Sequence, residues 1–277
     1  MLNVSAGSQS YEFEDEENEF LAAHDIIDAE RMAERQEEAD HRSTAERAAA
    51  DRTWAFGHVI VDEAQELSPM AWRLLMRRCP TRSMTLVGDP AQTADEAGCG
   101  GWEQILSPYV GGRWELVRLG VNYRTPAEIM EVAAAVLRER DPGFEPPRSV
   151  RATGVRPWVR ATGNLAQAVA EAVEHESPAE GRLAVIAPRA RHAALAAVLP
   201  GVRAGAEPDL TREVVLLDPR QAKGLEFDTV IVVEPADLRP SDLYVALTRA
   251  TQALGVVHTP GRLPAGLAGA GGGLLRR

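Results

Sequence analysis

The sequence is poor in cysteine and aromatic residues, and it contains no long apolar run. Only Cys79 and Cys99 occur in 277 residues, without the spacing of metal ligands, so neither a disulfide framework nor a cysteine metal site is indicated. No stretch reaches the roughly eighteen apolar residues of a membrane helix, and no basic segment leads into an apolar one near the N-terminus. We therefore expect a cytoplasmic protein with plain thiols.

The net charge of −11 argues against a generally basic nucleic-acid-binding protein, but one segment carries it. Residues 11–40 hold 13 acidic side chains against Arg31 and Arg35, a balance of −11, so the rest of the chain is neutral overall. A nucleic-acid groove could therefore exist elsewhere. Residues 12–50 have helical character with a weak apolar stripe, and two interpretations remain open: a solvated helical arm or an acidic arm that binds a partner.

From residue 54 the sequence alternates between short β-branched runs and amphipathic segments. Residues 56–63 and 83–89 are predicted strands, and a helix at 68–79 between them begins with Ser68 as cap and Pro69 at its first position. Two strands joined through a helix predict a parallel βαβ unit. Farther along we expect a helix at 125–140 capped by Thr125, strands at 181–188, 212–219, 227–235 and 254–259, and a helix at 240–253.

This pattern predicts an α/β protein with parallel sheets in two lobes. We expect an acidic, mostly helical arm at 1–53, a partial first lobe at 54–118, a complete second lobe at 119–260, and a Gly-rich disordered tail at 261–277.

Carboxylates stand where two of the predicted strands end. Asp62 and Glu63 end one strand, while Gly88, Asp89 and Gln92 follow the next. Because ligands gather at the carboxyl ends of parallel strands, both groups should face the same crevice. One carboxylate of such a pair can hold Mg²⁺ while the other polarises an attacking water. The alternative is that the pair is only a polar strand exit.

Five segments in a fixed order resemble the motifs of the UvrD/Rep-type superfamily 1 helicases. VIVDEAQELSP at 59–69 resembles the Walker B motif and LVGDPAQT at 86–93 the third motif, while VNYRTPAEI, QAKGLEFDTVIVVEP and YVALTRATQAL resemble the fourth, fifth and sixth. The resemblance implies RecA-like lobes and an ATP-dependent DNA helicase or translocase. The amino-acid sequence of residues 66–93 most resembles that of actinobacterial HelD-like ATPases, which implies RNA polymerase as a partner.

The resemblance also implies a site for ATP and Mg²⁺. In it, Asp62 would coordinate Mg²⁺ and Glu63 would be the general base acting on the hydrolytic water. Gln65 and Gln92 would sense the terminal phosphate, since an amide can donate to a phosphate oxygen and accept from water.

The second lobe would complete this site. By the same resemblance Arg124 and Arg249 would be arginine fingers, a role that suits a planar and permanently charged group. Tyr123 would stack on adenine, with core packing as the alternative. Glu226 would accept from the ribose hydroxyl, and Gly224 would let the backbone approach phosphate.

The sequence departs from the family in three respects. It contains no G-x-x-x-x-G-K-[ST] loop, so the amides and the lysine that bind the β- and γ-phosphates are missing. We therefore expect a portion of a motor cut within its first lobe, with an open edge on the strand at 83–89. Trp102 lacks the basic and aromatic context that single-strand binding and unwinding require. The interval between the fourth and fifth motifs is too short for the large insertion of unwinding members.

Two hypotheses follow. The first is a truncated or split motor that needs a P-loop from another polypeptide and is not an autonomous ATPase. The second is a non-catalytic module, derived from a HelD-like helicase, that binds RNA polymerase or another protein.

Overall fold

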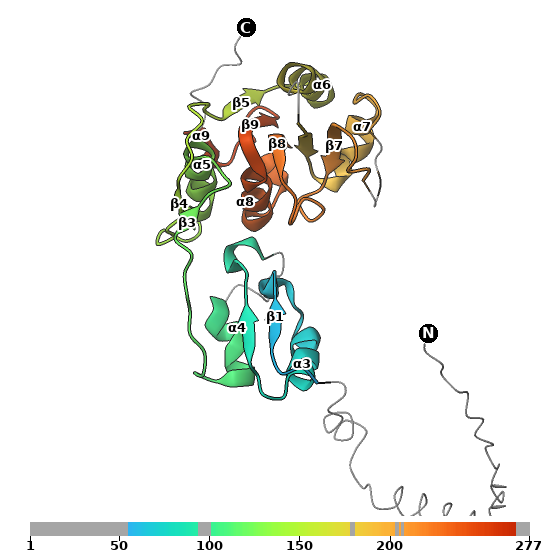
Figure 1. The fold of residues 1–277 in the computed structure, drawn as a ribbon. Helices are drawn as coiled ribbons and strands as arrows, with labels where there is room; N and C mark the ends of the chain where they lie inside the picture. Colours follow the sequence, from blue (N-terminus) through green and yellow to red (C-terminus); the bar gives the residue numbers. More distant parts are fainter. Residues whose placement is uncertain (1–54, 94–100, 178–180, 203–204, 206–207, 270–277) are drawn as a thin grey trace, which may run out of the picture. The chain divides into compact units, whose positions relative to one another are not determined.

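The computed structural model describes residues 55–93, 101–177, 181–202, 205 and 208–269 (Figure 1). The predicted acidic arm, Cys99 and residues 270–277 lie outside the described residues. Phe56–Arg277 form one compact unit. Within the described ranges no helix has both the length and the apolar character needed to cross a membrane.

The first sheet is small and parallel. Val59 pairs with Met84, and Val61 with Leu86, so the predicted βαβ unit is present. Ser68 caps the intervening helix, since its hydroxyl accepts from the backbone N–H of Ala71 at 3.2 Å. The elements of this part are β1 (Val59–Val61), η2 (Ala64–Glu66), α3 (Pro69–Arg78), β2 (Met84–Leu86), η3 (Pro90–Gln92) and α4 (Gly101–Val110).

Among the described residues, a core packs on one face of this first sheet. Buried Ala64, Trp72 and Leu106 form its core, and partly buried Trp102 packs against them. Ile60 points the other way and is 73% exposed. In the part of the chain that the structure describes, the sheet has two strands, so β2 has an open edge.

The second sheet has five parallel strands in the order β5-β9-β8-β6-β7. Its strands are β5 (Trp158–Ala161), β6 (Leu183–Ile186), β7 (Val214–Leu217), β8 (Phe227–Val233) and β9 (Ala250–His258). Its helices are α5 (Ala127–Arg138), α6 (Leu165–Glu176), α7 (His192–Ala196), α8 (Pro240–Thr248) and α9 (Ala265–Ala268), with short helices η5 (Arg189–Arg191) and η6 (Pro235–Asp237). A two-residue pair, β3 (Val121–Asn122) and β4 (Arg148–Ser149), lies outside this sheet.

Helices cover both faces of the second sheet (Figure 1). Val230 and Val232 of β8 pack in the cluster that contains α5, α8 and α9, whereas Ile231 and Val233 pack in the cluster that contains α6 and α7. A strand buried on both faces needs a continuous β-branched run, which is what residues 229–233 provide. The predicted α/β class with parallel sheets is confirmed.

Three local predictions are wrong. Thr125 does not cap α5: its hydroxyl donates to the carbonyl of Thr248 at 3.4 Å, and Pro126 holds the cap position. The predicted helix at 240–253 ends at Thr248, because residues from Ala250 pair with β8 instead. In the tail, residues 261–269 are ordered, since Leu267 of α9 is fully buried against α5.

The same strand exit occurs in both sheets. VIVDEAQELSP at 59–69 and VIVVEPADLRP at 230–240 each pass from a strand through a left-handed glutamate, a short helix and an extended leucine into a helix opened by proline. Glu63 and Glu234 both have φ 50°. The pattern of apolar, acidic and proline residues therefore dictates this elbow locally.

Candidate nucleotide-binding site

The elbow after β1 presents two adjacent carboxylates to solvent. Asp62 and Glu63 are both exposed, and one carboxylate oxygen of Asp62 accepts from the backbone N–H of Glu63 at 2.9 Å. A left-handed conformation costs a non-glycine residue about 1–2 kcal/mol, so the fold retains strain here. Strain of this kind is common at functional sites.

Gln65 joins the ends of the two strands. It is 4% exposed, its amide nitrogen donates to the Glu63 carboxylate at 2.6 Å, and its amide oxygen accepts from the backbone N–H of Asp89 at 3.1 Å. Gly88 is required beside it, because a Cβ there would lie 2.0 Å from the Gln65 amide oxygen. In this structure both polar groups of Gln65 have protein partners, so it orients the Glu63 carboxylate; its role as a phosphate sensor stays a prediction.

The loop after β2 continues this network. The Asp89 carboxylate accepts from the backbone N–H of Ala91 at 3.0 Å and from the side-chain amide of Gln92 at 2.9 Å. The amide oxygen of Gln92 faces Arg249 Nη2 at 3.4 Å. The polar chain thus runs from the first sheet to the end of α8, so Gln92 and Arg249, predicted from separate motifs, do come together.

Arg249 is a buried cation. It is 2% exposed, and its Nε donates to the carbonyl of Val245 at 3.1 Å. Burial and, after it, the positive charge of Arg124 lower the pKa of its guanidinium, while Glu63 and Glu226 act to raise it, and the net result is a pKa of about 10. Arg249 is therefore still charged near neutral pH, in surroundings that strengthen its pull on an anion.

Tyr123 and Arg124 project from a turn that Asn122 builds. The Asn122 side-chain oxygen accepts from the backbone N–H groups of Arg124 and Thr125, at 3.0 and 3.1 Å. Tyr123 is 71% exposed, which excludes the core-packing interpretation. Arg124 pairs with Glu226 at 3.1 Å, with side chains 37% and 52% exposed, so this ion pair is weak and either partner can turn to a ligand.

The loop before β8 approaches the same place. Gly224 adopts φ +71°, a conformation that favours glycine. Its neighbour Lys223 has its amine 2.5 Å from a Glu66 carboxylate oxygen and 2.9 Å from the carbonyl oxygen of Gln92. Burial also raises the pKa of the Tyr244 phenol, and the charge of Asp89 adds to this effect. These contacts place the loops around η3 and α8 within electrostatic reach of one another.

Three predicted pairs of side chains meet in the structure: Glu63 with Gln65, Gln92 with Arg249, and Arg124 with Glu226. Among the described residues, Asp62, Tyr123 and Gly224 bond to no other predicted site side chain. Asn122 was missed, although an asparagine two and three residues before the amides it binds is the signature of an Asx turn. Asp89 was recognised only by its position at a strand end.

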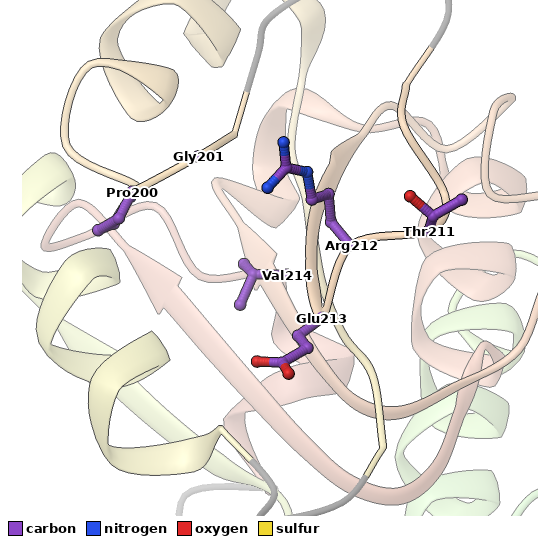
Figure 2. A pocket seen from close by; sticks show the side chains of 6 residues that line it. All are labelled: Pro200, Gly201, Thr211, Arg212, Glu213 and Val214. Carbon is purple, nitrogen blue, oxygen red and sulfur yellow. The ribbon is translucent and has the colours of Figure 1, made fainter.

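A separate hollow lies at the start of β7 (Figure 2). It measures about 330 Å³ and is lined by Pro200, Gly201, Thr211, Arg212, Glu213 and Val214. None of the predicted site residues lines it. This hollow is therefore distinct from the candidate site.

Asp62 and Glu63 could hold Mg²⁺ only together with the phosphates of a bound nucleotide. Across the described ranges, no three His, Cys, Asp or Glu side chains are grouped so as to hold a metal ion. Mg²⁺ is commonly held by one or two carboxylates together with substrate phosphates, so Asp62 alone fits the protein's share of such a site.

Comparison with known protein families finds a match in one segment of the chain. Residues 213–257 match the UvrD-like helicase C-terminal domain. This match covers β7, β8, α8 and most of β9, and it includes Gly224, Glu226 and Arg249. Among curated protein sequences no significant match was found.

Several solved helicase structures are similar in part. The C-terminal domain of a possible DNA helicase from Lactobacillus plantarum is 23% identical with a TM-score of 0.42, over 54% of this chain and 94% of that one. The PRRSV helicase is 18% identical with a TM-score of 0.43, over 73% of this chain. An arterivirus nonstructural protein 10 helicase, solved with DNA, is 17% identical with a TM-score of 0.42, over 79% of this chain. The chain spans 35% and 43% of the length of these two viral helicases.

Proposed function

We propose that this chain supplies the water-activating and second-lobe half of a nucleotide hydrolysis site in a DNA helicase- or translocase-type motor. The phosphate-binding loop would come from outside these 277 residues, because the sequence holds none. On this proposal the chain alone is not an autonomous ATPase. We further propose that the motor is of the HelD-like type, which acts on RNA polymerase.

One observation carries this proposal: a buried, charged arginine at the end of a chain of polar contacts that starts at an exposed glutamate. Glu63, Gln65, Asp89, Gln92 and Arg249 form this chain through side-chain and backbone contacts of 2.6 to 3.4 Å. A site of this composition pairs a proton acceptor with a cation directed at developing negative charge.

Each residue can be given a task. Glu63, held by Gln65, would take the proton of an attacking water. Arg249 and Arg124 would neutralise negative charge on the transferring phosphoryl group, an effect worth about three to five decades in rate where such fingers are known. Asp62 would hold Mg²⁺, which when bound supplies charge neutralisation at the phosphate oxygens.

The nucleoside end fits the second lobe. Exposed Tyr123 offers a ring face for adenine. Glu226, which forms an ion pair with the neighbouring Arg124, offers an acceptor for a ribose hydroxyl. Gly224 leaves open space above its Cα, since no atom lies within 4 Å of the position a Cβ would take. The groups that would bind the β- and γ-phosphates are missing from this sequence.

Photolabelling with an 8-azido-adenine nucleotide and Mg²⁺ tests the nucleoside half directly. We expect ATP-competable labelling of the segment around Tyr123, reduced by Tyr123→Ala and Arg124→Ala and unchanged by Glu174→Gln on the exposed surface of α6. Labelling that ATP does not compete, or that ignores Tyr123→Ala, would contradict the proposal.

ATP turnover tests the other half. The purified chain, with and without single-stranded DNA, is expected to show no Mg²⁺-dependent hydrolysis above background. Turnover that Glu63→Gln and Arg249→Ala both abolish would mean that the site is complete within the chain, and that the half-site proposal is wrong.

A non-catalytic interaction module is the second candidate. The absence of a phosphate loop from the sequence favours it, as does the exposure of Ile60, which is 73% exposed among the described residues. Binding of purified RNA polymerase that survives Glu63→Gln and Arg249→Ala, with no competable photolabelling, would select this function.

A further inference from the structure

Two guanidinium groups of the candidate site are held near each other against their mutual repulsion. The charge of Arg124 disfavours the charged form of Arg249, so the two cations act on one another. Glu226 compensates only partly, because its ion pair with Arg124 is half-exposed and therefore weak. Uncharged contacts between the two segments that carry the arginines therefore matter to their spacing.

Arg151 makes such contacts. Its Nη1 donates to the carbonyl of Arg124 at 3.2 Å and its Nη2 to the carbonyl of Thr251 at 3.2 Å. Its own carbonyl accepts from the backbone N–H of Ala127, in the first turn of α5, at 2.9 Å. One residue thus bonds the turn that carries Arg124, the start of α5 and the strand that begins beside Arg249.

The chemistry of the side chain suits this bridge. A guanidinium is a planar fork that can donate to two acceptors at once, which a lysine ammonium on a flexible stem does less well. Thr125 adds a weaker tie in the same direction through its 3.4 Å bond to the Thr248 carbonyl.

We propose that Arg151 is a positioning residue that clasps the Arg124 and Arg249 segments together and so sets the spacing of the two arginine fingers. The role of these arginines rests on the proposed function. The clasp itself can be tested without nucleotide, so failure of the one is distinguishable from failure of the other.

Arginine footprinting of the full chain tests the clasp. Phenylglyoxal modification is measured by mass spectrometry at each arginine in wild type, Arg151→Ala and the matched control Arg148→Ala. Arg148 is exposed on the paired strand β4, and its guanidinium forms no hydrogen bond or ion pair within the described residues. Arg160, tied to Glu171 at 2.6 Å, serves as an internal reference.

In Arg151→Ala we expect Arg124 to react about three- to tenfold faster, the range that loss of one or two ordinary hydrogen bonds allows. The rate at Arg160 should not change, and Arg148→Ala should behave as wild type. An unchanged rate at Arg124, or an equal rise at Arg160, would overturn the proposal, since the second result means general loosening.

Arg151→Lys covers the case in which the alanine variant fails to fold. It keeps the charge but not the fork. We expect a circular dichroism spectrum like that of wild type together with faster modification of Arg124. Wild-type reactivity at Arg124 in the lysine variant would show that charge rather than the two-carbonyl clasp is what matters.

Discussion

Replacing Arg249 by methionine should stabilise the protein while removing its proposed function. Arg249 is 2% exposed, and its pKa falls from the ordinary value of an arginine to about 10, chiefly because burial penalises the charge. A depression of this size corresponds to roughly 3 kcal/mol against the charged form. Methionine fills much of the same volume without a charge, and such replacements of buried ions are often neutral or stabilising by about 1–4 kcal/mol.

The hydrogen bonds of Arg249 reduce this gain. Its contacts with the carbonyls of Val245 and Leu225, at 3.1 and 3.4 Å, would be lost, and bonds of this kind contribute about 0.5–1.5 kcal/mol each. We therefore expect Arg249→Met to raise the unfolding free energy by about 1–2 kcal/mol. Arg249→Lys keeps a buried charge but loses the fork, so it should be less stable than wild type.

Urea unfolding of the full chain, followed by circular dichroism at neutral pH, measures both variants. A methionine variant less stable than wild type by more than about 1 kcal/mol would refute the reasoning, because Arg249 would then be a net support of the fold. The pH dependence gives an independent check. The folded pKa lies below the unfolded one, so between about pH 10 and the ordinary pKa of arginine the unfolded state binds more protons and wild-type stability rises with pH. The methionine variant should lack that rise.

Three further predictions concern stability and nucleotide binding. Gly88→Ala should destabilise by about 1–3 kcal/mol in urea unfolding, because its Cβ would displace the buried Gln65 amide 2.0 Å away; an equally stable variant would contradict the tight contact. Glu234→Gln should cost about 3 kcal/mol by thermal unfolding, since it removes a fully buried carboxylate that faces Arg262 and accepts from Thr259. Tyr123→Ala should leave the unfolding free energy within about 0.5 kcal/mol of wild type, and any loss of adenine photolabelling in a destabilised variant would not support stacking.

Much of the fold was predictable because local sequence patterns determine most of its helices and strands. β-branched runs become strands, Ser68 and Pro69 open α3, and alternation of strands with helices gives parallel sheets. The site was predictable to the extent that strand ends meet at one edge. That rule brought Glu63 and Gln65 close to Asp89, and the ordered motifs indicated Arg124 and Arg249.

The failures share one physical cause, which is competition from distant partners. ATQA at 250–253 can be helical or extended, and pairing with β8 selects the strand. Leu267 lies in a Gly-rich tail that looks disordered, yet its burial against α5 orders α9. Arg151 belongs to no motif, and only its two carbonyl partners, from segments far apart in the sequence, make it notable.

The two glutamate elbows separate what sequence and tertiary structure each decide. The repeated pattern VIV-x-E ahead of a leucine and a proline is enough to place Glu63 and Glu234 at the same left-handed position after a strand, because backbone sterics and proline act locally. Their surroundings are not local. Glu63 is exposed beside an open two-stranded sheet, whereas Glu234 is fully buried at the end of β8 within a five-stranded one. Sequence set the backbone geometry of both glutamates, and packing decided which of their carboxylates is exposed to solvent.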